Sequence, residues 1–175
     1  MANSYSKFEV IRVSPTLDTS AISADNVVFF NSTAIPNAVL GKGGCSKLVG
    51  LSILNEDDVA HDFDIIFMQT SQDLGTINDV VGSNSKWTNA LAKSAGVLGI
   101  IRVDWSDNNT DLINNLVFTA RTGDAAGNGE GLPMLLQAAA GSTSVYFAAV
   151  SRDGNTQSIT TAADDYEFIF HIEKT

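Results

Sequence analysis

Short apolar and β-branched runs, separated by polar turns, dominate the pattern of this 175-residue chain. Residues 7–13 alternate between polar and apolar side chains, as expected of a half-buried strand. Residues 166–173 alternate more strongly, with large apolar side chains on one face and polar ones on the other. Further runs with the composition of strands span residues 26–30, 46–54, 62–68, 97–103, 116–119 and 144–150.

Two segments depart from this strand pattern. Residues 85–95 have the spacing of an amphipathic helix, with Ser85 placed as its N-cap and Trp87 on its apolar face. Residues 132–138 are compatible with two structures, because Pro133 favours an edge strand whereas the residues that follow are good helix formers.

Together these elements predict an all-β fold. The chain has about eight or nine predicted strands, one short helix and no alternation of strands with helices, which indicates an antiparallel β-sandwich with a jelly-roll-like topology. The polar segment 55–61 predicts an antiparallel hairpin between the strands on either side of it. We expect one domain, residues 7–175, preceded by a flexible N-terminal arm at residues 1–6, which are polar.

The charge of the chain argues against two classes of partner. Twenty acidic and ten basic residues give a net charge of −10. Binding to nucleic acid requires clustered lysine and arginine, and the basic residues here are scattered singly, so we expect no nucleic-acid partner. An anionic membrane surface would repel the chain, and no apolar stretch approaches the roughly 20 residues that span a bilayer. We therefore expect no membrane partner.

The compartment of synthesis is predicted from two features. The first nine residues lack the charged and apolar regions of a signal peptide. The single Cys45 cannot form an intrachain disulfide and offers no metal cluster. We expect synthesis in a reducing cytoplasm.

Candidates for catalysis are few. His61 and His171 are the two histidines available as bases for a hydrolytic triad. His61 lies in an acidic turn and His171 on the polar face of the last strand, so both are expected to be exposed imidazoles. The chain contains no Gly-x-Ser-x-Gly motif. These observations favour a protein that is not an enzyme.

Two acidic turns carry oxygen-bearing side chains of the kind that bind metal ions. Residues 104–110 carry alternating oxygen-bearing side chains, as a calcium loop does. Asn109 and Asn115, however, stand where such a loop has glycine and glutamate. A structural turn is favoured there, and also at residues 57–62. We expect no metal and no cofactor.

Four residues are candidates for contact with a ligand or partner: Trp87, Trp105, Asp107 and Asn108. Trp105 lies beside a polar turn, which predicts an exposed aromatic ring. Exposed tryptophan with Asp or Asn is typical of shallow sugar sites on jelly rolls.

A series of motifs covers most of the chain. They span residues 14–21, 24–29, 35–39, 43–44, 48–54, 56–58, 63–67, 145–150 and 166–172. They include Thr-Leu-Asp-Thr-Ser-Ala at residues 16–21 and Ile-Pro-Asn-Ala-Val at residues 35–39. With these motifs the chain resembles a family of tailed-bacteriophage virion structural proteins. Ile22 departs from the aromatic or small polar residue common at that position in the family.

The resemblance implies a β-sandwich protein of the virion, most similar to capsid decoration (cement) proteins on the surface of the phage head. It implies the major capsid protein as a partner, together with further copies of the chain, as a homotrimer. It supplies no active-site residues. The alternatives are a tail or baseplate protein, a head-fibre receptor-binding (adhesin) module, and a surface depolymerase or lysin.

Overall fold

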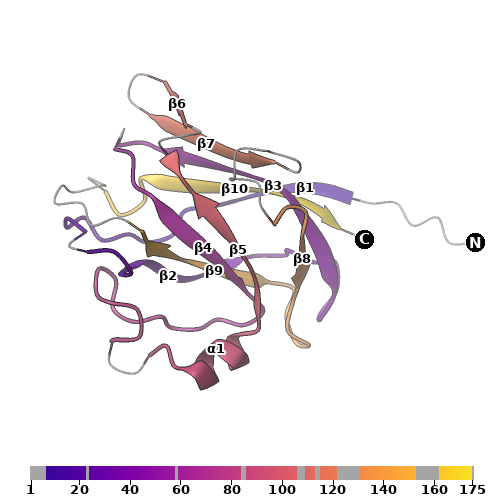
Figure 1. Cartoon of the computed structure of the whole chain (residues 1–175). Coiled ribbons are helices and arrows are strands. Elements are labelled where there is room, and N and C mark those ends of the chain that lie inside the picture. Colours follow the sequence, from indigo (N-terminus) through magenta and orange to yellow (C-terminus); the bar gives the residue numbers. More distant parts are fainter. Residues whose placement is uncertain are drawn as a thin grey trace, which may run out of the picture.

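The computed structural model describes residues 7–22, 24–57, 59–83, 86–105, 109–112, 115–121, 131–152 and 162–174. Within these residues the chain forms ten strands and one helix (Figure 1). The strands are β1 (Lys7–Val13), β2 (Val28–Ile35), β3 (Cys45–Asn55), β4 (Phe63–Met68), β5 (Val97–Val103), β6 (Asn109–Asp111), β7 (Leu116–Arg121), β8 (Met134–Gln137), β9 (Val145–Ser151) and β10 (Tyr166–Lys174). The helix is α1 (Asn89–Ala95).

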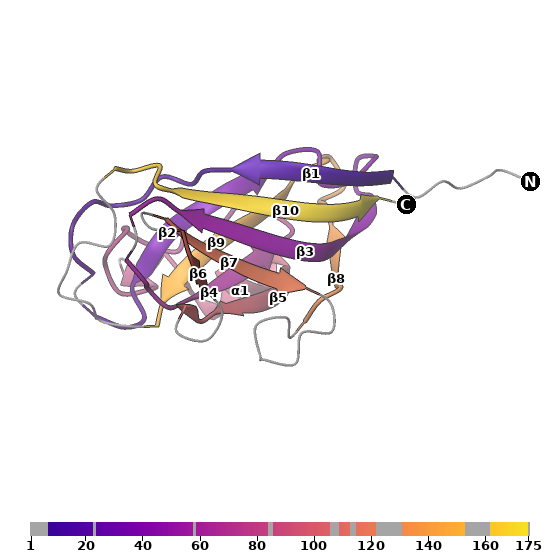
Figure 2. The same cartoon turned by 90° about the horizontal axis from the view of Figure 1, so that it is seen from above.

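Two antiparallel sheets pack face to face (Figure 2). The first sheet has the strand order β1-β10-β3-β7-β6, with β8 also paired to β3, and the second has the order β2-β9-β4-β5. The pairs are nested along the chain: β1 with β10, β2 with β9, β3 with β7 and β8, and β4 with β5. Nested antiparallel pairs that alternate between two sheets form a jelly roll. The predicted fold class is confirmed, with ten strands in place of eight or nine.

Aromatic side chains fill the space between the sheets. The alternation along β10 turns Tyr166, Phe168 and Phe170 inward, and none has exposed surface. From β9 of the opposite sheet, the ring of Phe147 lies 5.2 Å from that of Phe168 and 4.9 Å from that of Phe170. Phe30 of β2 lies 5.2 Å from both Phe147 and Phe168. Because a one-residue slip would turn these rings to solvent, the aromatic contacts fix the register of both sheets.

A smaller apolar cluster covers the other face of the second sheet, next to α1. Val28, Met68 and Ala148 contribute from strands, and Ala95 contributes from the helix. The continuous apolar run at the start of β2 is thus buried on both faces, since Val28 enters this cluster and its neighbours enter the main core.

The helix is shorter than residues 85–95. Thr88 is its N-cap, with Oγ1 accepting a hydrogen bond from the Leu91 N–H at 3.3 Å, and Gly96 ends it in the left-handed conformation. The prediction of Ser85 as N-cap is wrong because Thr88 occupies the capping position, and Ser85 itself lies outside the described residues. None of the described helical structure has the length and apolar composition needed to cross a membrane.

The predicted hairpin around residues 55–61 is wrong. Both sides of β3 are occupied, by β10 on one side and by β7 and β8 on the other, so β4 pairs in the other sheet. Asn55 stabilises the crossing, because its Nδ2 donates to the Val59 carbonyl at 2.8 Å and to the Tyr166 hydroxyl at 2.9 Å. Burial, with smaller effects of Asp57 and Asp165, raises the pKa of Tyr166 and keeps this hydroxyl protonated.

The ambiguous segment around Pro133 forms the strand β8, so the edge-strand alternative is confirmed. Strand β6 has only three residues and was not predicted. The expected arm at residues 1–6 lies outside the described residues, and the division into an arm and one domain stays a prediction.

Replacing Phe147 with alanine tests the aromatic core. The substitution removes ring contacts to both sheets and leaves a cavity, so we expect the free energy of unfolding to fall by about 3–5 kcal/mol. Urea unfolding followed by fluorescence measures the change. The matched control is Ile100→Ala, because Ile100 is 53% exposed and its truncation is expected to change stability by less than about 0.5 kcal/mol. Equal losses in the two variants would contradict the assignment of the core.

Candidate interaction surface

One face of the first sheet points away from the core, and we call it the outer face. Along β10, buried residues alternate with half-buried ones, so every second side chain lies on this face. Its side chains on β1, β3, β8, β10 and β7 include Phe8, Val10, Arg12, Lys47, Val49, Ser52, Leu135, Glu167, Ile169, His171, Glu173, Val117 and Thr119. The predicted polar face of residues 166–173 forms its centre.

A hollow of about 460 Å³ lies in the outer face where β10, β3 and β7 meet. Val49, Ser52, Thr119 and His171 line it around Gly50. A Cβ atom on Gly50 would lie 3.5 Å from His171 Cδ2, so the glycine leaves this space open. The register of β10 against β3 shifts between His171 and the next residue, and such a bulge increases the local twist of a sheet. The bulge and the glycine explain the concavity.

The charges that lie on the outer face are paired across strands. Arg12 of β1 contacts Glu167 of β10 through Nη1 and Oε2, and Lys47 Nζ of β3 lies 3.4 Å from Glu173 Oε2. Exposed pairs of this kind contribute about 0–1 kcal/mol to stability. Their main effect is therefore to balance the charge of the surface.

A further pair closes the end of the sheet where β1 begins. Lys174 is 3% exposed, and its Nζ lies 2.7 Å from Glu9 Oε2. Lys7 Nζ lies 3.1 Å from the same oxygen. Hydrogen bonds from Lys174 and then from Lys7 hold the pKa of Glu9 below its usual value. A buried ammonium group needs such a partner, because an uncompensated buried charge is strongly destabilising.

The strands around the outer face are balanced in charge although the chain as a whole is acidic. Strands β1, β3 and β10 contain four basic and three acidic side chains, which gives them a net charge of +1. Since the whole chain carries −10, the remainder carries −11. An acidic partner, including another copy of this chain, therefore meets little repulsion from these strands.

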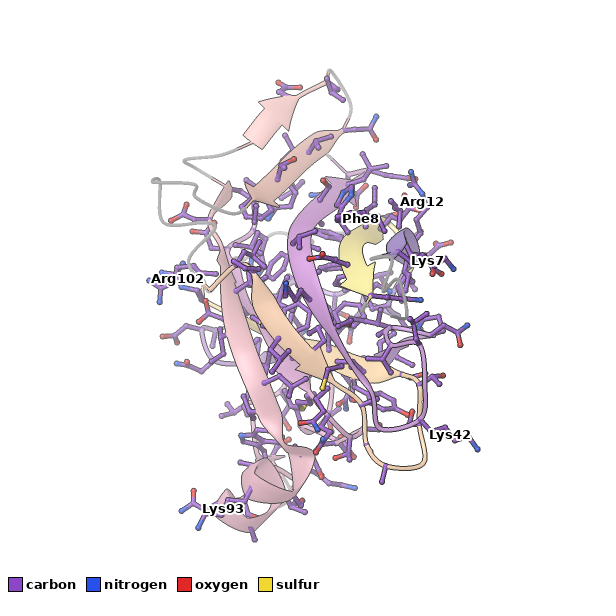
Figure 3. The ribbon with its side chains drawn as sticks, turned by 90° about the vertical axis from the view of Figure 1, so that its right-hand side faces the viewer. Lys7, Phe8, Arg12, Lys42, Lys93 and Arg102 are labelled. Carbon is purple, nitrogen blue, oxygen red and sulfur yellow. The ribbon has the colours of Figure 1, made fainter. Side chains whose placement is uncertain are left out.

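Large apolar side chains are exposed at both sides of the outer face. On β1, Phe8 is 70% exposed and Val10 54% exposed, and on β8 Leu135 is 60% exposed. Figure 3 shows Phe8 together with Lys7 and Arg12 at one edge of the sheet. Exposed apolar groups near a hollow and rimmed by paired charges are the composition of a protein-binding surface.

His61 and Ser151 form a contact that resembles the histidine–serine pair of a catalytic triad. His61 Nε2 lies 3.0 Å from Ser151 Oγ. The residues are only 2% and 1% exposed, and the imidazole ring lies 5.4 Å from that of Phe29. The expectation of an exposed imidazole at residue 61 is wrong, because this end of the turn packs into the sandwich. Burial of the serine oxygen makes the pair unsuited to attack on a substrate.

The predicted contact residues do not form a common site in the described structure. Trp105 has no exposed surface, and its ring lies 5.9 Å from that of Phe118, so its expected role at the surface is wrong. The backbone N–H of Trp105 donates to Asp62 Oδ1 at 2.9 Å, which holds the residue against the core. Trp87 is half-buried against the cluster next to α1. Asp107 and Asn108 lie outside the described residues.

Within the described ranges, no group of three or more His, Cys, Asp or Glu side chains is placed to hold a metal ion. Residues 106–108 of the calcium-like segment and Asp58 of the other turn lie outside those ranges.

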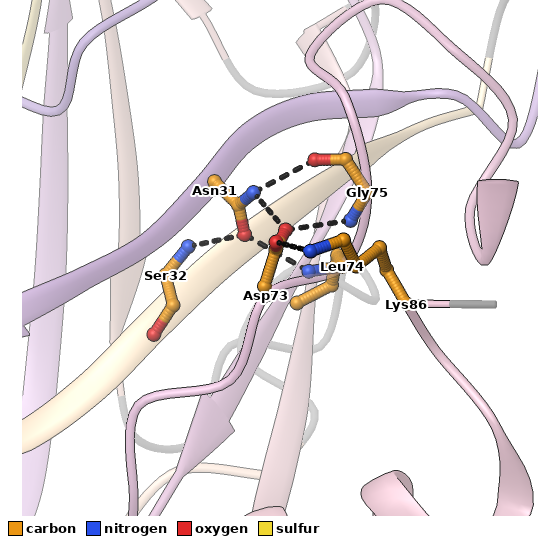
Figure 4. Close-up of polar contacts among 6 residues, drawn as sticks. All are labelled: Asn31, Ser32, Asp73, Leu74, Gly75 and Lys86. Carbon is orange, nitrogen blue, oxygen red and sulfur yellow. Dashed lines mark hydrogen bonds and ion pairs between the residues drawn. The ribbon is translucent and has the colours of Figure 1, made fainter. Parts of the chain in front are cut away.

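A polar cluster attaches residues 73–75, in the loop after β4, to the middle of β2 (Figure 4). Asn31 Nδ2 donates to Asp73 Oδ1 at 2.7 Å and to the Gly75 carbonyl at 2.8 Å. Asn31 Oδ1 accepts from the Ser32 and Leu74 N–H groups. The bond from Asn31 is the largest of the effects that hold the pKa of Asp73 below its usual value. No motif in the sequence pointed to this cluster.

Comparisons with known proteins add little. No protein-family model matches the chain, and no curated protein matches it. Among solved structures it is similar to a chain in the cryo-EM structure of the semi-empty virus-like particle of the giant freshwater prawn Macrobrachium rosenbergii nodavirus. The identity is 12%, the TM-score is 0.34, and the match covers 98% of this chain and 95% of that chain. A TM-score this low supports no inference about function.

Substitutions of Asn31 test the polar cluster. Asn31→Ala removes both donors and the acceptor, so we expect a loss of about 1–3 kcal/mol in the free energy of unfolding. Asn31→Asp keeps the acceptor but places a carboxylate against Asp73, so its stability is expected to recover as the pH falls. Urea unfolding at several pH values measures both effects. A stability of Asn31→Ala equal to that of the natural chain would contradict the role of the cluster.

The acid titration of Asp73 gives a second test. Its pKa lies below 3.8, so its contribution to stability is present above pH 3.8 and is lost as the pH falls through the folded-state value. In Asn31→Ala we expect the pKa of Asp73 to rise toward 3.8, since the main stabilising bond to the carboxylate is absent. Titration of the Asp73 carboxyl carbon by NMR measures it. An unchanged pKa in the variant would show that Asn31 is not the cause.

Proposed function

We propose that this chain is a non-enzymatic structural protein of a tailed-phage particle, and specifically a decoration protein that binds the outer surface of the head. The observation that carries this proposal is the outer face, where exposed Phe8, Val10 and Leu135 adjoin a hollow within a charge-balanced sheet. The resemblance of the sequence to phage virion proteins supplies the class of particle.

A decoration role suits the physical properties of this surface. It exposes only a few large apolar side chains, which favours weak individual binding that is multiplied over many copies on a repeating shell. The jelly roll behind the surface is closely packed and changes shape little under load. The charge of −10 keeps free copies soluble and repels packaged DNA, so the proposed partner is the major capsid protein.

The tail and adhesin alternatives predict a different surface and a different copy number. A sugar site of the predicted kind requires exposed tryptophan, and Trp105 is buried. The adhesin alternative is therefore less well supported than decoration. A tail or fibre protein would also be present in few copies per particle, whereas a decoration protein is present in a fixed ratio to the major capsid protein.

The test uses phage particles from which the protein has been removed. Adding the pure chain back is expected to saturate at a fixed ratio to the major capsid protein and to raise the temperature at which particles release DNA. Leu135→Glu places a charge on the outer face and is expected to weaken binding about tenfold, or about 1.4 kcal/mol. Quantitative mass spectrometry of sedimented particles measures binding.

Leu112→Glu is the matched control, because Leu112 is 54% exposed but follows β6, away from the hollow. We expect it to bind as the natural chain does. Saturation at a few copies per particle, or particles equally heat-resistant with and without the chain, would contradict the proposal. Equal weakening by both substitutions would contradict the role of the outer face.

A further inference from the structure

The described strands of the two sheets include five edge strands, β1, β6 and β8 in the first sheet and β2 and β5 in the second, and all but β1 are protected against pairing with another chain. Exposed edges carry unpaired N–H and C=O groups that invite a further strand, and proteins shorten, bend or cover such edges. Strands β6 and β8 are short, with three and four residues. At β5, a Cβ on Gly99 would lie 2.6 Å from Met134 Cε, and one on Gly131 would lie 3.5 Å from the Ile100 carbonyl oxygen. The segment leading into β8 therefore packs against β5.

The edge at β2 is both bent and covered. The register of β2 against β9 shifts twice, between Val28 and Phe30 and again before Thr33. The Val28 N–H donates to the Asp79 carbonyl at 2.9 Å, and the Val28 carbonyl accepts from the Asn78 N–H at 2.8 Å. The loop after β4 thus uses hydrogen-bonding groups that a second chain would need.

Strand β1 has none of these protections in the described part of the molecule. It is seven residues long and pairs with β10 in one continuous register without a bulge (Figure 2). Its other side is hydrogen-bonded to no described strand. Charged residues often protect an edge, but Lys7 is engaged with Glu9, and Arg12 with Glu167. Phe8 and Val10 remain exposed along the strand.

We propose that β1 pairs antiparallel with β1 of a second copy of this chain, about a two-fold axis at Val10, and so joins two first sheets into one. A second copy is the favoured occupant because β1, β3 and β10 together carry +1, whereas the rest of each copy carries −11. Two copies that meet at β1 therefore bring no cluster of unpaired acidic side chains together. The two-fold pairing is isologous and closes at two copies.

The sequence of β1 selects this register. Side chains of the outer face must stay on the same face in both copies. The even-numbered residues of β1 can therefore lie opposite only even-numbered residues of the other copy. With Val10 opposite Val10 of the partner copy, Phe8 lies opposite Arg12, an arrangement that favours a cation–π contact. If one strand slips by two residues in one direction, Glu9 lies opposite Glu9 of the other copy, and the two carboxylates repel each other. The opposite shift places Val10 against Arg12 and leaves Phe8 beyond the end of the pairing strand.

The inference goes beyond the proposed function, because it concerns the free chain and requires no particle. It also differs from the homotrimer implied by the family resemblance, since identical antiparallel strands pair two copies and not three. A chain that binds particles but stays monomeric would overturn only this inference. A chain that dimerises but does not bind particles would overturn only the proposed function.

The first experiment measures mass in solution. Analytical ultracentrifugation of the full chain is expected to show a monomer–dimer equilibrium. Val10→Lys and Val10→Glu each place like charges opposite one another, so each variant alone is expected to be monomeric. An equimolar mixture of the two variants places opposite charges together and is expected to restore the dimer. Ile100→Lys, on β5, is the matched control and is expected to dimerise as the natural chain does.

The second experiment tests the register by cross-linking. Cys45 is the single cysteine, so Cys45→Ser gives a background without thiols. In that background Val10→Cys places two thiols opposite each other, and oxidised glutathione is expected to form a covalent dimer. Phe8→Cys is the control, because residues 8 of two copies are then too far apart to bridge. The proposal would be overturned if the natural chain were monomeric, or if it formed a trimer that Val10→Lys does not disrupt. It would also be overturned if the mixture of Val10→Lys and Val10→Glu failed to dimerise, or if Phe8→Cys cross-linked as well as Val10→Cys.

Discussion

The aromatic contacts between the two sheets are the constraint on which the rest of the structure depends. Phe168 and Phe170 of β10 meet Phe147 from the opposite sheet, Tyr166 meets Phe63 from that sheet, and all five rings are fully buried. Since successive residues of a strand point to opposite faces, committing these rings to the core also commits the intervening residues of β10 to solvent. The outer face exists because the core takes the other half of the same strands.

The nested topology explains where the adhesive features lie. The first and last strands pair, which leaves β1 at an edge with Phe8 and Val10 exposed. Strand β3 lies in the middle of the first sheet, where its bulge against β10 and Gly50 form the hollow. The same packing buries His61 and Trp105, so two residues that the sequence offered as candidates for catalysis or ligand contact belong to the core. What remains exposed on this side is a surface suited to binding protein.

The sequence was sufficient for the fold class but not for the site. Periodicity marks strands reliably where one face is buried and the other wet, as in residues 166–173 and 7–13, and both limits are close to those of β10 and β1. Periodicity does not predict which strands pair when that depends on contacts distant in sequence. The turn at 55–61 connects two sheets because β10 occupies the side of β3 at which β4 would have to pair. Trp105 was misplaced because a polar neighbourhood in sequence says nothing of the strand that packs over it. The hollow depends on a bulge between β10 and β3, which a single segment cannot reveal.

Hydrogen–deuterium exchange of the natural chain, free at low concentration and bound to particles, tests most directly whether it works through the first sheet. The account predicts that binding slows exchange in peptides from β1, β3 and β10, while peptides from β5 and from the loop after β4 exchange as before. The account would be contradicted if binding slowed exchange only in peptides from β5 and the loop after β4 and left β1 and β3 unchanged.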